Sequence, residues 1–200
     1  MFVLDNIVSI LSMLITFISI LVSIVIFRKN RKLQKELKSF NWEKVHTATL
    51  ELGKIIKKSY NPDIILTYTP RSGIIALLLR DTINIKCPVF VCVVYHKKSP
   101  PNFAPSHFMK IETNKMDIFI PDALLDYIHK KILIVDEYTL TGDSLSVLKN
   151  FLISIGFDDK RIKTASLIQT TTAKLSRKSP DYSFFTVDYT DFYLPWGKAL

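Results

Sequence analysis

The sequence has few of the residues that build disulfide-rich or zinc-centred domains. It contains two cysteines, Cys87 and Cys92, and four histidines, at positions 46, 96, 107 and 129. The cysteines are an odd number of positions apart in an apolar, strand-like run, so an alternating strand points them to opposite faces. The histidines are scattered and have no zinc-ligand spacing. We therefore expect neither a disulfide nor a zinc site, which fits a reducing compartment.

Glycine is also scarce, with 5 in 200 residues, whereas hydrophobic residues make up 48%. These proportions exclude a fibrous chain and a disordered one. Neither an internal repeat nor a low-complexity tract occurs. The length suits one domain with an appendage.

Positive charge is in excess, with a formal net charge of +9. Residues 28–38 hold six Lys/Arg and one Glu, more than half of that excess. This basic run directly follows an uncharged apolar segment, so a membrane surface explains it better than nucleic acid does. No basic face with interleaved aromatic residues occurs elsewhere, and we expect no nucleic-acid partner.

The apolar segment covers residues 7–27, which is 21 residues without a charge. A helix of this length spans roughly 30 Å, the thickness of a bilayer core. A cleaved signal peptide, the main rival, would have basic residues before the apolar run and small residues at a cleavage site. Here Asp5 precedes the run and the basic residues follow it. We predict a transmembrane anchor (1–27) and a basic juxtamembrane segment (28–39), with the N-terminus outside and the remaining chain cytoplasmic.

The polar residues of this anchor repeat every three or four positions, which places them on one helical face. They are Ser9, Ser12, Thr16, Ser19 and Ser23. Small hydroxyl residues let helices approach closely, which favours a homo-oligomer or a membrane partner. The alternative is that the hydroxyls bond their own backbone carbonyls and face lipid.

Residues 40–200 have the pattern of an α/β domain. We predict helices at 42–58, 73–83 and 143–155, and core strands at 63–68, 88–95, 131–135 and 162–169. We also predict a long loop at 96–115, a short strand at 118–120 and a helical turn at 124–129. Strands that alternate with helices indicate a mainly parallel twisted sheet flanked by helices. Ligands of such sheets bind beyond the carboxyl ends of the strands.

Residues 131–148 carry the clearest chemistry. An apolar strand runs into two adjacent acids, Asp136 and Glu137, and a helix starts a few residues later. Gly142 permits a tight turn, and the N–H groups at a helix start favour an anion such as a phosphate. The two carboxylates suit hydroxyl groups and a hydrated divalent cation. A sugar phosphate with Mg²⁺ would suit both the helix start and the two carboxylates. The alternative is a plain strand-to-helix turn that is capped by Asp143 and Ser144.

This stretch, VDEYTLTGDS, resembles the motif of type I phosphoribosyltransferases that binds phosphoribosyl pyrophosphate (PRPP). The resemblance implies their fold with a small hood, and PRPP and Mg²⁺ as ligands. It implies that Asp136 and Glu137 engage the ribose hydroxyls and hold Mg²⁺ through water or PRPP. The 5′-phosphate loop then consists of Thr139, Leu140, Thr141, Gly142, Asp143 and Ser144.

Two further segments fit the same family. PDIILTYTPRSGIIA, at 62–76, resembles its first core strand and pyrophosphate loop, which implies pyrophosphate binding by Arg71, Ser72 and Gly73, with Arg71 also catalytic. The tail, with YLPWG at 193–197, resembles xanthine/guanine-type members. That resemblance implies that an aromatic residue, Tyr182 or Trp196, packs on the nucleobase. The alternative is that both side chains simply pack in the core of the domain.

The loop at 96–115 corresponds to a mobile loop that closes over PRPP in the family. The resemblance implies catalytic roles for Lys97 and Lys98, and the alternative is an ordinary solvated basic loop. The sequence departs from purine-salvage members at Leu140, where they often carry Asp, and at Gln169-Thr170, where they present a lysine. Glu137 and Ser72 stand where the family usually has Asp and Gly.

The resemblance implies a membrane-anchored enzyme that transfers the phosphoribosyl group of PRPP–Mg²⁺ to a nucleobase-like acceptor and releases pyrophosphate. Two alternatives stay open. One is a non-catalytic sensor of PRPP or a nucleotide. The other is a membrane-associated effector that acts with a partner.

Overall fold

The computed structural model describes residues 13, 16–31, 38–84, 86–98, 106–188 and 190–199. They fall into two compact units. The larger unit is Asn41–Thr190 and contains the α/β domain. The smaller unit combines Met1–Phe40 with Asp191–Leu200.

A five-stranded parallel sheet forms the centre of the larger unit, in the order β2-β1-β6-β7-β8. Its strands are β1 (Ile64–Thr67), β2 (Val89–Val91), β6 (Ile132–Thr139), β7 (Ile162–Thr170) and β8 (Tyr182–Val187). This confirms the predicted parallel α/β sheet. The sequence reading missed β8, because an edge strand with half-exposed side chains lacks the apolar run of a buried one.

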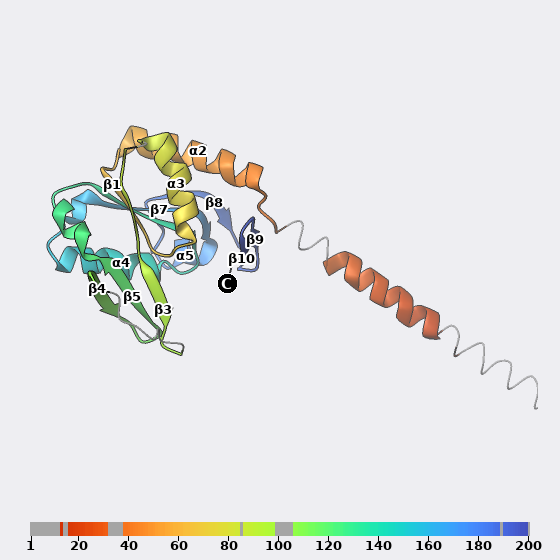
Figure 1. The fold of residues 1–200 in the computed structure, drawn as a ribbon. Helices are drawn as coiled ribbons and strands as arrows, with labels where there is room; N and C mark the ends of the chain where they lie inside the picture. Colours follow the sequence, from red (N-terminus) through yellow and green to blue (C-terminus); the bar gives the residue numbers. More distant parts are fainter. Residues whose placement is uncertain are drawn as a thin grey trace, which may run out of the picture. The chain divides into compact units, whose positions relative to one another are not determined.

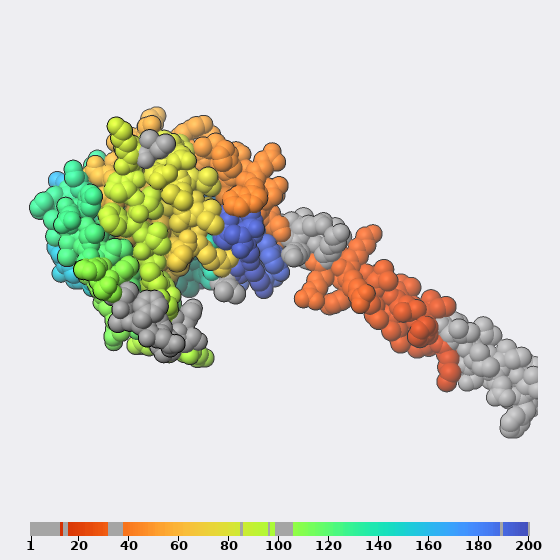
Figure 2. Space-filling model, in the orientation of Figure 1, coloured from red at the N-terminus to blue at the C-terminus, as the bar shows by residue number. Residues whose placement is uncertain are grey.

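Helices cover both faces of this sheet (Figure 1). They are α2 (Trp42–Ser59), α3 (Ser72–Ile83), α4 (Asp143–Ser154) and the short α5 (Thr171–Leu175). Helices α2 and α3 lie side by side, as the orange and yellow surfaces of Figure 2 show. Gly53 permits this close approach, because a Cβ there would lie 2.8 Å from the Cβ of Thr82.

The core beneath α4 is built from alternate residues of the central strands. Ile64 and Leu66 of β1 and Ile132 and Ile134 of β6 belong to one buried cluster with Leu148 of α4. The intervening strand residues point to the opposite face, toward α3. The alternation fixes the register of the strands and therefore which side chains end at the carboxyl edge of the sheet.

A three-stranded antiparallel sheet, in the order β3-β5-β4, adjoins the parallel one. Its strands are β3 (Val93–His96), β4 (Phe108–Glu112) and β5 (Met116–Pro121), and the 3-10 helix η1 (Asp122–Tyr127) confirms the predicted helical turn. Two predictions were wrong here. The strand predicted at 88–95 divides at Cys92 between two sheets, and the loop predicted at 96–115 contains β4. Met109 and Ile111 of β4 alternate toward the core, an apolar signal that the neighbouring prolines and lysines obscured.

Cys87 and Cys92 are both buried free thiols, which confirms that they form no disulfide. Burial raises the pKa of Cys87 to about 11 and that of Cys92 to about 12. Both thiols are therefore protonated and unreactive at neutral pH.

The smaller unit contains a helix at residues 16–31 and a hairpin of β9 (Tyr193–Leu194) and β10 (Gly197–Lys198). Phe40 packs edge-on against Phe192, with ring centroids 5.9 Å apart. Within the described part of the chain, no helix combines the length and the apolar character needed to cross a membrane, so the predicted anchor finds no support in the structure. Residues 1–12, 14 and 15 of that anchor, with Ser9 and Ser12, lie outside the described residues.

Candidate functional site

The candidate site lies at the carboxyl edge of β1 and β6. Strand β6 continues to Thr139, beyond its predicted end at residue 135, so Asp136 and Glu137 are strand residues rather than loop residues. Both are buried, with 8% and 3% of their surface exposed. Burial of two adjacent carboxylates is costly unless they are paired or hydrogen-bonded, so their partners define the site.

Ser72 is the partner of Asp136. Its hydroxyl donates to Asp136 Oδ1 at 2.9 Å, and the Glu137 backbone N–H donates to the same oxygen at 2.9 Å. The Thr69 hydroxyl lies 2.8 Å from that of Ser72 and extends the network. Burial raises the pKa of Asp136 from 3.8 to about 7, and the Glu137 charge adds to this effect, while the Ser72 bond opposes it. The pKa of Asp136, the first acid of the motif, is therefore affected by a hydrogen bond from the predicted pyrophosphate loop.

Arg71 is a partner of Glu137. Its Nε lies 3.6 Å from Glu137 Oε1, and its side chain is 37% exposed whereas that of Glu137 is 4% exposed. Opposite charge stabilises the buried carboxylate, and the exposed part of the guanidinium faces solvent. The structure therefore brings together Arg71, Ser72, Asp136 and Glu137, four of the predicted site residues.

The backbone of the predicted pyrophosphate loop differs from the expectation. Helix α3 begins at Ser72, so Gly73 lies in its first turn. The N–H groups of Ser72, Gly73 and Ile74 donate to Thr69 Oγ1, Pro70 O and Arg71 O. A Cβ on Gly73 would meet nothing within 4 Å. These amides are therefore engaged internally, unlike the amides of the expected pyrophosphate loop.

The loop after β6 has the geometry expected of an anion-binding turn. Gly142 has a φ of +81°, and a Cβ on it would lie 2.0 Å from the carbonyl oxygen of Lys178, so only glycine fits. The Thr141 hydroxyl donates to Asp143 Oδ2 at 2.8 Å. Asp143 also forms an ion pair with Lys178. Helix α4 starts at Asp143, and its N-terminus faces the same loop.

A hollow of about 350 Å³ opens beside this loop. Its walls come from two segments that are far apart in the sequence. The loop and α4 contribute Thr141, Asp143, Ser144 and Val147, and the β4–β5 turn and its flanks contribute Thr113, Asn114, Lys115, Met116 and Ile118, with Tyr68 after β1. Burial raises the pKa of Tyr68, and a hydrogen bond with Ser144 opposes this. Sequence reasoning missed Tyr68 and Lys115; position at the end of a core strand was the available signal for Tyr68.

Besides Thr67 Oγ1 at the end of β1, two buried polar atoms at the same edge have no hydrogen-bond partner among the described residues. They are Thr139 Oγ1 and Gln169 Oε1, which belong to register partners on β6 and β7. Buried polar atoms are nearly always satisfied in folded proteins, so such orphans are typical of positions that water or a ligand completes. Thr139 thus stays within the predicted site, and Gln169 lies next to it.

The remaining predicted residues are not brought into this cluster. Tyr182 begins β8, at the amino edge of the parallel sheet, and its hydroxyl accepts a hydrogen bond from Ser59 at 3.0 Å. Trp196 lies in the β9–β10 turn of the smaller unit. Lys97 and Lys98 are exposed after β3, and the Lys97 N–H donates to the Lys115 carbonyl at 3.1 Å. The backbone of Lys97 therefore lies next to the β4–β5 turn that lines the hollow, whereas Tyr182 lies at the amino edge of the sheet.

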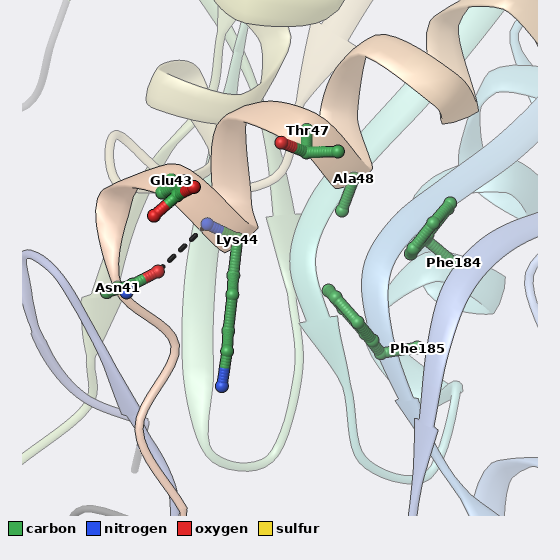
Figure 3. A pocket seen from close by; sticks show the side chains of 7 residues that line it. All are labelled: Asn41, Glu43, Lys44, Thr47, Ala48, Phe184 and Phe185. Carbon is green, nitrogen blue, oxygen red and sulfur yellow. Dashed lines mark hydrogen bonds between the residues drawn. The ribbon is translucent and has the colours of Figure 1, made fainter.

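A second hollow, of about 370 Å³, lies between the first turns of α2 and β8 (Figure 3). It is lined by Asn41, Glu43, Lys44, Thr47, Ala48, Phe184 and Phe185. The two phenylalanine rings pack edge-on, 4.9 Å apart. None of the motif residues reaches this hollow, so it is not the candidate site.

No group of three or more His, Cys, Asp or Glu side chains able to hold a metal ion occurs in the described ranges. The adjacent carboxylates Asp136 and Glu137 supply hard oxygen donors. Mg²⁺ keeps several waters and is commonly held by one or two carboxylates plus substrate phosphates. The residues present therefore fit a Mg²⁺ ion that arrives with a pyrophosphate-bearing ligand.

The fold of this chain is similar to the folds of solved phosphoribosyltransferases. A purine phosphoribosyltransferase from Pyrococcus horikoshii is 23% identical, with 80% of this chain and 95% of that chain covered and a TM-score of 0.59. The xanthine-guanine-hypoxanthine enzyme from Helicobacter pylori is 20% identical, with 80% and 92% covered and a TM-score of 0.52. An adenine enzyme from Trypanosoma brucei, in complex with AMP, pyrophosphate and ribose-5-phosphate, is 10% identical, with 70% and 64% covered and a TM-score of 0.53.

No protein-family model matches the sequence, and a search of curated proteins gave no significant match. At the identities above, the similarity establishes the fold. The chain thus has the α/β phosphoribosyltransferase fold, and the solved structures it is similar to include purine phosphoribosyltransferases.

Proposed function

We propose that this protein binds PRPP with Mg²⁺ and transfers the phosphoribosyl group to a nucleobase-like acceptor, with release of pyrophosphate. The observation that carries the proposal is the joining of the acid pair to the Arg71-Ser72 segment, through Ser72–Asp136 at 2.9 Å and Arg71–Glu137 at 3.6 Å. This links hydroxyl-binding carboxylates to a cation at one edge of the sheet. The hollow lined by Thr141 and Ser144 would provide a second position for an anion.

In the proposed reaction a ring nitrogen of the acceptor forms a bond to C1 of the ribose. The bond between C1 and the pyrophosphate oxygen breaks, pyrophosphate leaves with its electron pair, and the acceptor nitrogen loses its proton. Positive charge develops on the ribose ring during the displacement. Asp136 and Glu137 would hold the ribose hydroxyls, and Arg71, with the loop residues Lys97 and Lys98, would stabilise the leaving pyrophosphate.

Mg²⁺, when bound with PRPP, would neutralise pyrophosphate charge. Asp136 and Glu137 would reach it through water or through PRPP. The Trypanosoma brucei structure contains AMP, pyrophosphate and ribose-5-phosphate, which are the product and the parts of PRPP that these two anion positions would take.

The test is a pyrophosphate-release assay on the full-length protein. PRPP and Mg²⁺ are supplied with a panel of purine and pyrimidine bases, one at a time. Release that depends on one base supports the transferase and names its acceptor. PRPP binding without release from any base contradicts the transferase.

A second candidate is a PRPP or nucleotide sensor without catalysis, or an effector that acts with a partner. Two observations favour it. Leu140 stands where purine-salvage enzymes often have Asp, and its carbonyl accepts a hydrogen bond from Thr170. The amides of the predicted pyrophosphate loop already donate to Thr69, Pro70 and Arg71, which directly precede α3. A sensor predicts PRPP binding in the assay above, with no pyrophosphate release from any base.

We further propose membrane attachment through residues 7–27, with the N-terminus outside and the domain in the cytoplasm. The described part of this segment is helical, and its large apolar side chains are 42–72% exposed. The helical residues Thr16, Ser19 and Ser23 share one side of it and would provide the self-association face. Protease protection of an N-terminal epitope in sealed vesicles tests this topology, and release of the protein by carbonate washing contradicts it.

A further inference from the structure

The β4–β5 turn brings a lysine to the hollow beside the phosphate loop. Its shape is fixed by Thr113, whose hydroxyl donates to the Met116 carbonyl at 2.7 Å and accepts from the Met116 N–H at 3.0 Å. The Thr113 N–H also donates to the Met116 carbonyl at 3.0 Å. Because the turn is closed by three bonds, Lys115, one of the two exposed residues inside it, is held at the rim of the hollow.

We infer that Lys115 binds the 5′-phosphate of PRPP, opposite the Thr141–Ser144 loop. The inference rests on the proposed function and adds a residue to it from the antiparallel sheet. The hollow has hydroxyl groups from Thr141 and Ser144 on one wall and the lysine on the other. A phosphate monoester carries nearly two negative charges at neutral pH, and a loop of hydroxyls and amides alone leaves them unneutralised.

Lys115 differs in its pairing from the lysines around it. Lys110, in the same hairpin, lies 3.0 Å from Asp117 and also contacts Glu112. Lys178 is paired with Asp143. In the described part of the chain, Lys115 has no carboxylate within ion-pair distance. Its ammonium group is therefore available for a ligand, whereas those of Lys110 and Lys178 are engaged.

The charge of Lys115 acts on the loop residues already in the absence of a ligand. The pKa of Asp143 lies below its ordinary value, chiefly because of the hydrogen bond from Lys178, and Lys115 contributes to the same lowering. Asp143 would repel a phosphate, but its charge is offset by Lys178. The net positive charge at this end of the hollow is then supplied by Lys115.

The two anion positions of the site thus have different cations. Arg71 sits beside the acid pair, where pyrophosphate would lie, and Lys115 sits at the 5′-phosphate end. Loss of Lys115 should weaken ligands that carry a sugar 5′-phosphate and spare inorganic pyrophosphate. A merely structural role for Lys115 would weaken both.

The experiment measures binding of ribose 5-phosphate, inorganic pyrophosphate and PRPP to the full-length protein in the presence of Mg²⁺. Lys115→Ala is compared with Lys115→Arg and with Lys130→Ala, which removes an exposed lysine just before β6, at the opposite edge of the sheet. We expect Lys115→Ala to weaken ribose 5-phosphate and PRPP by roughly 10- to 100-fold, the range for one charged hydrogen bond. Pyrophosphate binding should stay within about twofold, Lys115→Arg should restore most of the affinity, and Lys130→Ala should match the wild type.

Unchanged ribose 5-phosphate binding by a folded Lys115→Ala variant overturns the inference and leaves the proposed function standing. An equal loss of pyrophosphate binding also overturns it. If the wild-type protein binds none of the three ligands, the proposed function fails and the inference fails with it. Circular dichroism and thermal unfolding of each variant show that it is folded.

Discussion

The Ser72 hydroxyl donates a hydrogen bond of 2.9 Å to Asp136 Oδ1, which joins residues 64 positions apart in the sequence. Ser72 begins α3 and Asp136 lies near the end of β6, so the bond connects the two segments that carry the proposed pyrophosphate and ribose contacts. A buried acid with a raised pKa is typical of a functional position, because such an acid costs stability when it ionises. The relationship leads directly to the first prediction.

Asp136→Asn should stabilise the protein at alkaline pH while it weakens PRPP binding. The pKa of Asp136 is raised from 3.8 to about 7 in the folded state, so the folded state holds the proton more tightly than the unfolded state does. The free energy of unfolding should therefore fall as pH rises from about 4 to 7, and the asparagine variant should lack this fall. At pH 8 the variant should gain up to roughly 4 kcal/mol, and near pH 3 almost nothing.

Chemical denaturation at several pH values measures this difference. Asp126→Asn, an exposed acid on η1, is the control and should follow the wild-type pH dependence. If the free energies of unfolding of Asp136→Asn and the wild type differ by the same amount at every pH, burial does not raise the pKa of Asp136 in the folded protein.

Gly142→Ala and Gly73→Ala should behave in opposite ways. At Gly142 the left-handed φ of +81° and the Lys178 carbonyl, 2.0 Å from the added Cβ, require the loop to move, which should cost at least about 1–3 kcal/mol and weaken phosphate binding. Gly73 lies in the first turn of α3 with open space around it, and alanine favours helix by up to about 1 kcal/mol. Thermal unfolding of the two variants side by side checks the contrast, and equal tolerance of both would contradict the geometry of the loop.

Asp181→Asn should destabilise the protein at neutral pH and much less in acid. Asp181 accepts hydrogen bonds from Lys163 Nζ at 2.8 Å, and from the Thr164 N–H and hydroxyl at 2.9 Å each. Burial acts to raise its pKa, but these bonds outweigh it and hold the pKa below the ordinary value. The stabilisation is present above the unfolded pKa of about 3.9 and is lost as pH falls through the folded pKa.

The expected loss for Asp181→Asn at pH 7 is about 1.5–3 kcal/mol, the range for hydrogen bonds to a charged group. Urea denaturation at pH 7 and pH 3 measures it. A loss of the same size at both pH values would mean that the carboxylate charge contributes nothing.

Much of the α/β domain could be predicted from the sequence, because buried parallel strands are continuous apolar runs separated by amphipathic helices. The strand predicted at 131–135, which is the first part of β6, and the helix starting at Asp143 were identified from this pattern. Strand β8 was not, since Phe184 is 41% exposed and its neighbours are only half-buried. The break at Cys92 was also unpredictable, because an apolar run does not show that its two halves pair in different sheets.

The acid pair and its partners could be predicted because each half of the site is a local motif. Lys115 could not, because it reaches the loop after β6 only through the pairing of β3, β4 and β5. For Tyr68 the sequence offered one signal, its position at the end of a core strand. Tyr182 is the opposite case, because the sequence predicted it in the site and the structure places it elsewhere. Its local sequence resembles the base-contacting tail of the family, but the parallel direction of β8 places it at the amino edge of the sheet.

The central claim is tested most directly by PRPP turnover in the double variant Asp136→Asn plus Glu137→Gln. The control double variant, Glu43→Gln plus Asp126→Asn, removes the same charge from exposed positions. We predict that Mg²⁺-dependent pyrophosphate release falls by at least about 100-fold in the first variant, since two charged contacts to the ribose are lost, and that the control keeps wild-type release. Wild-type release by the folded Asp136/Glu137 variant would contradict the account.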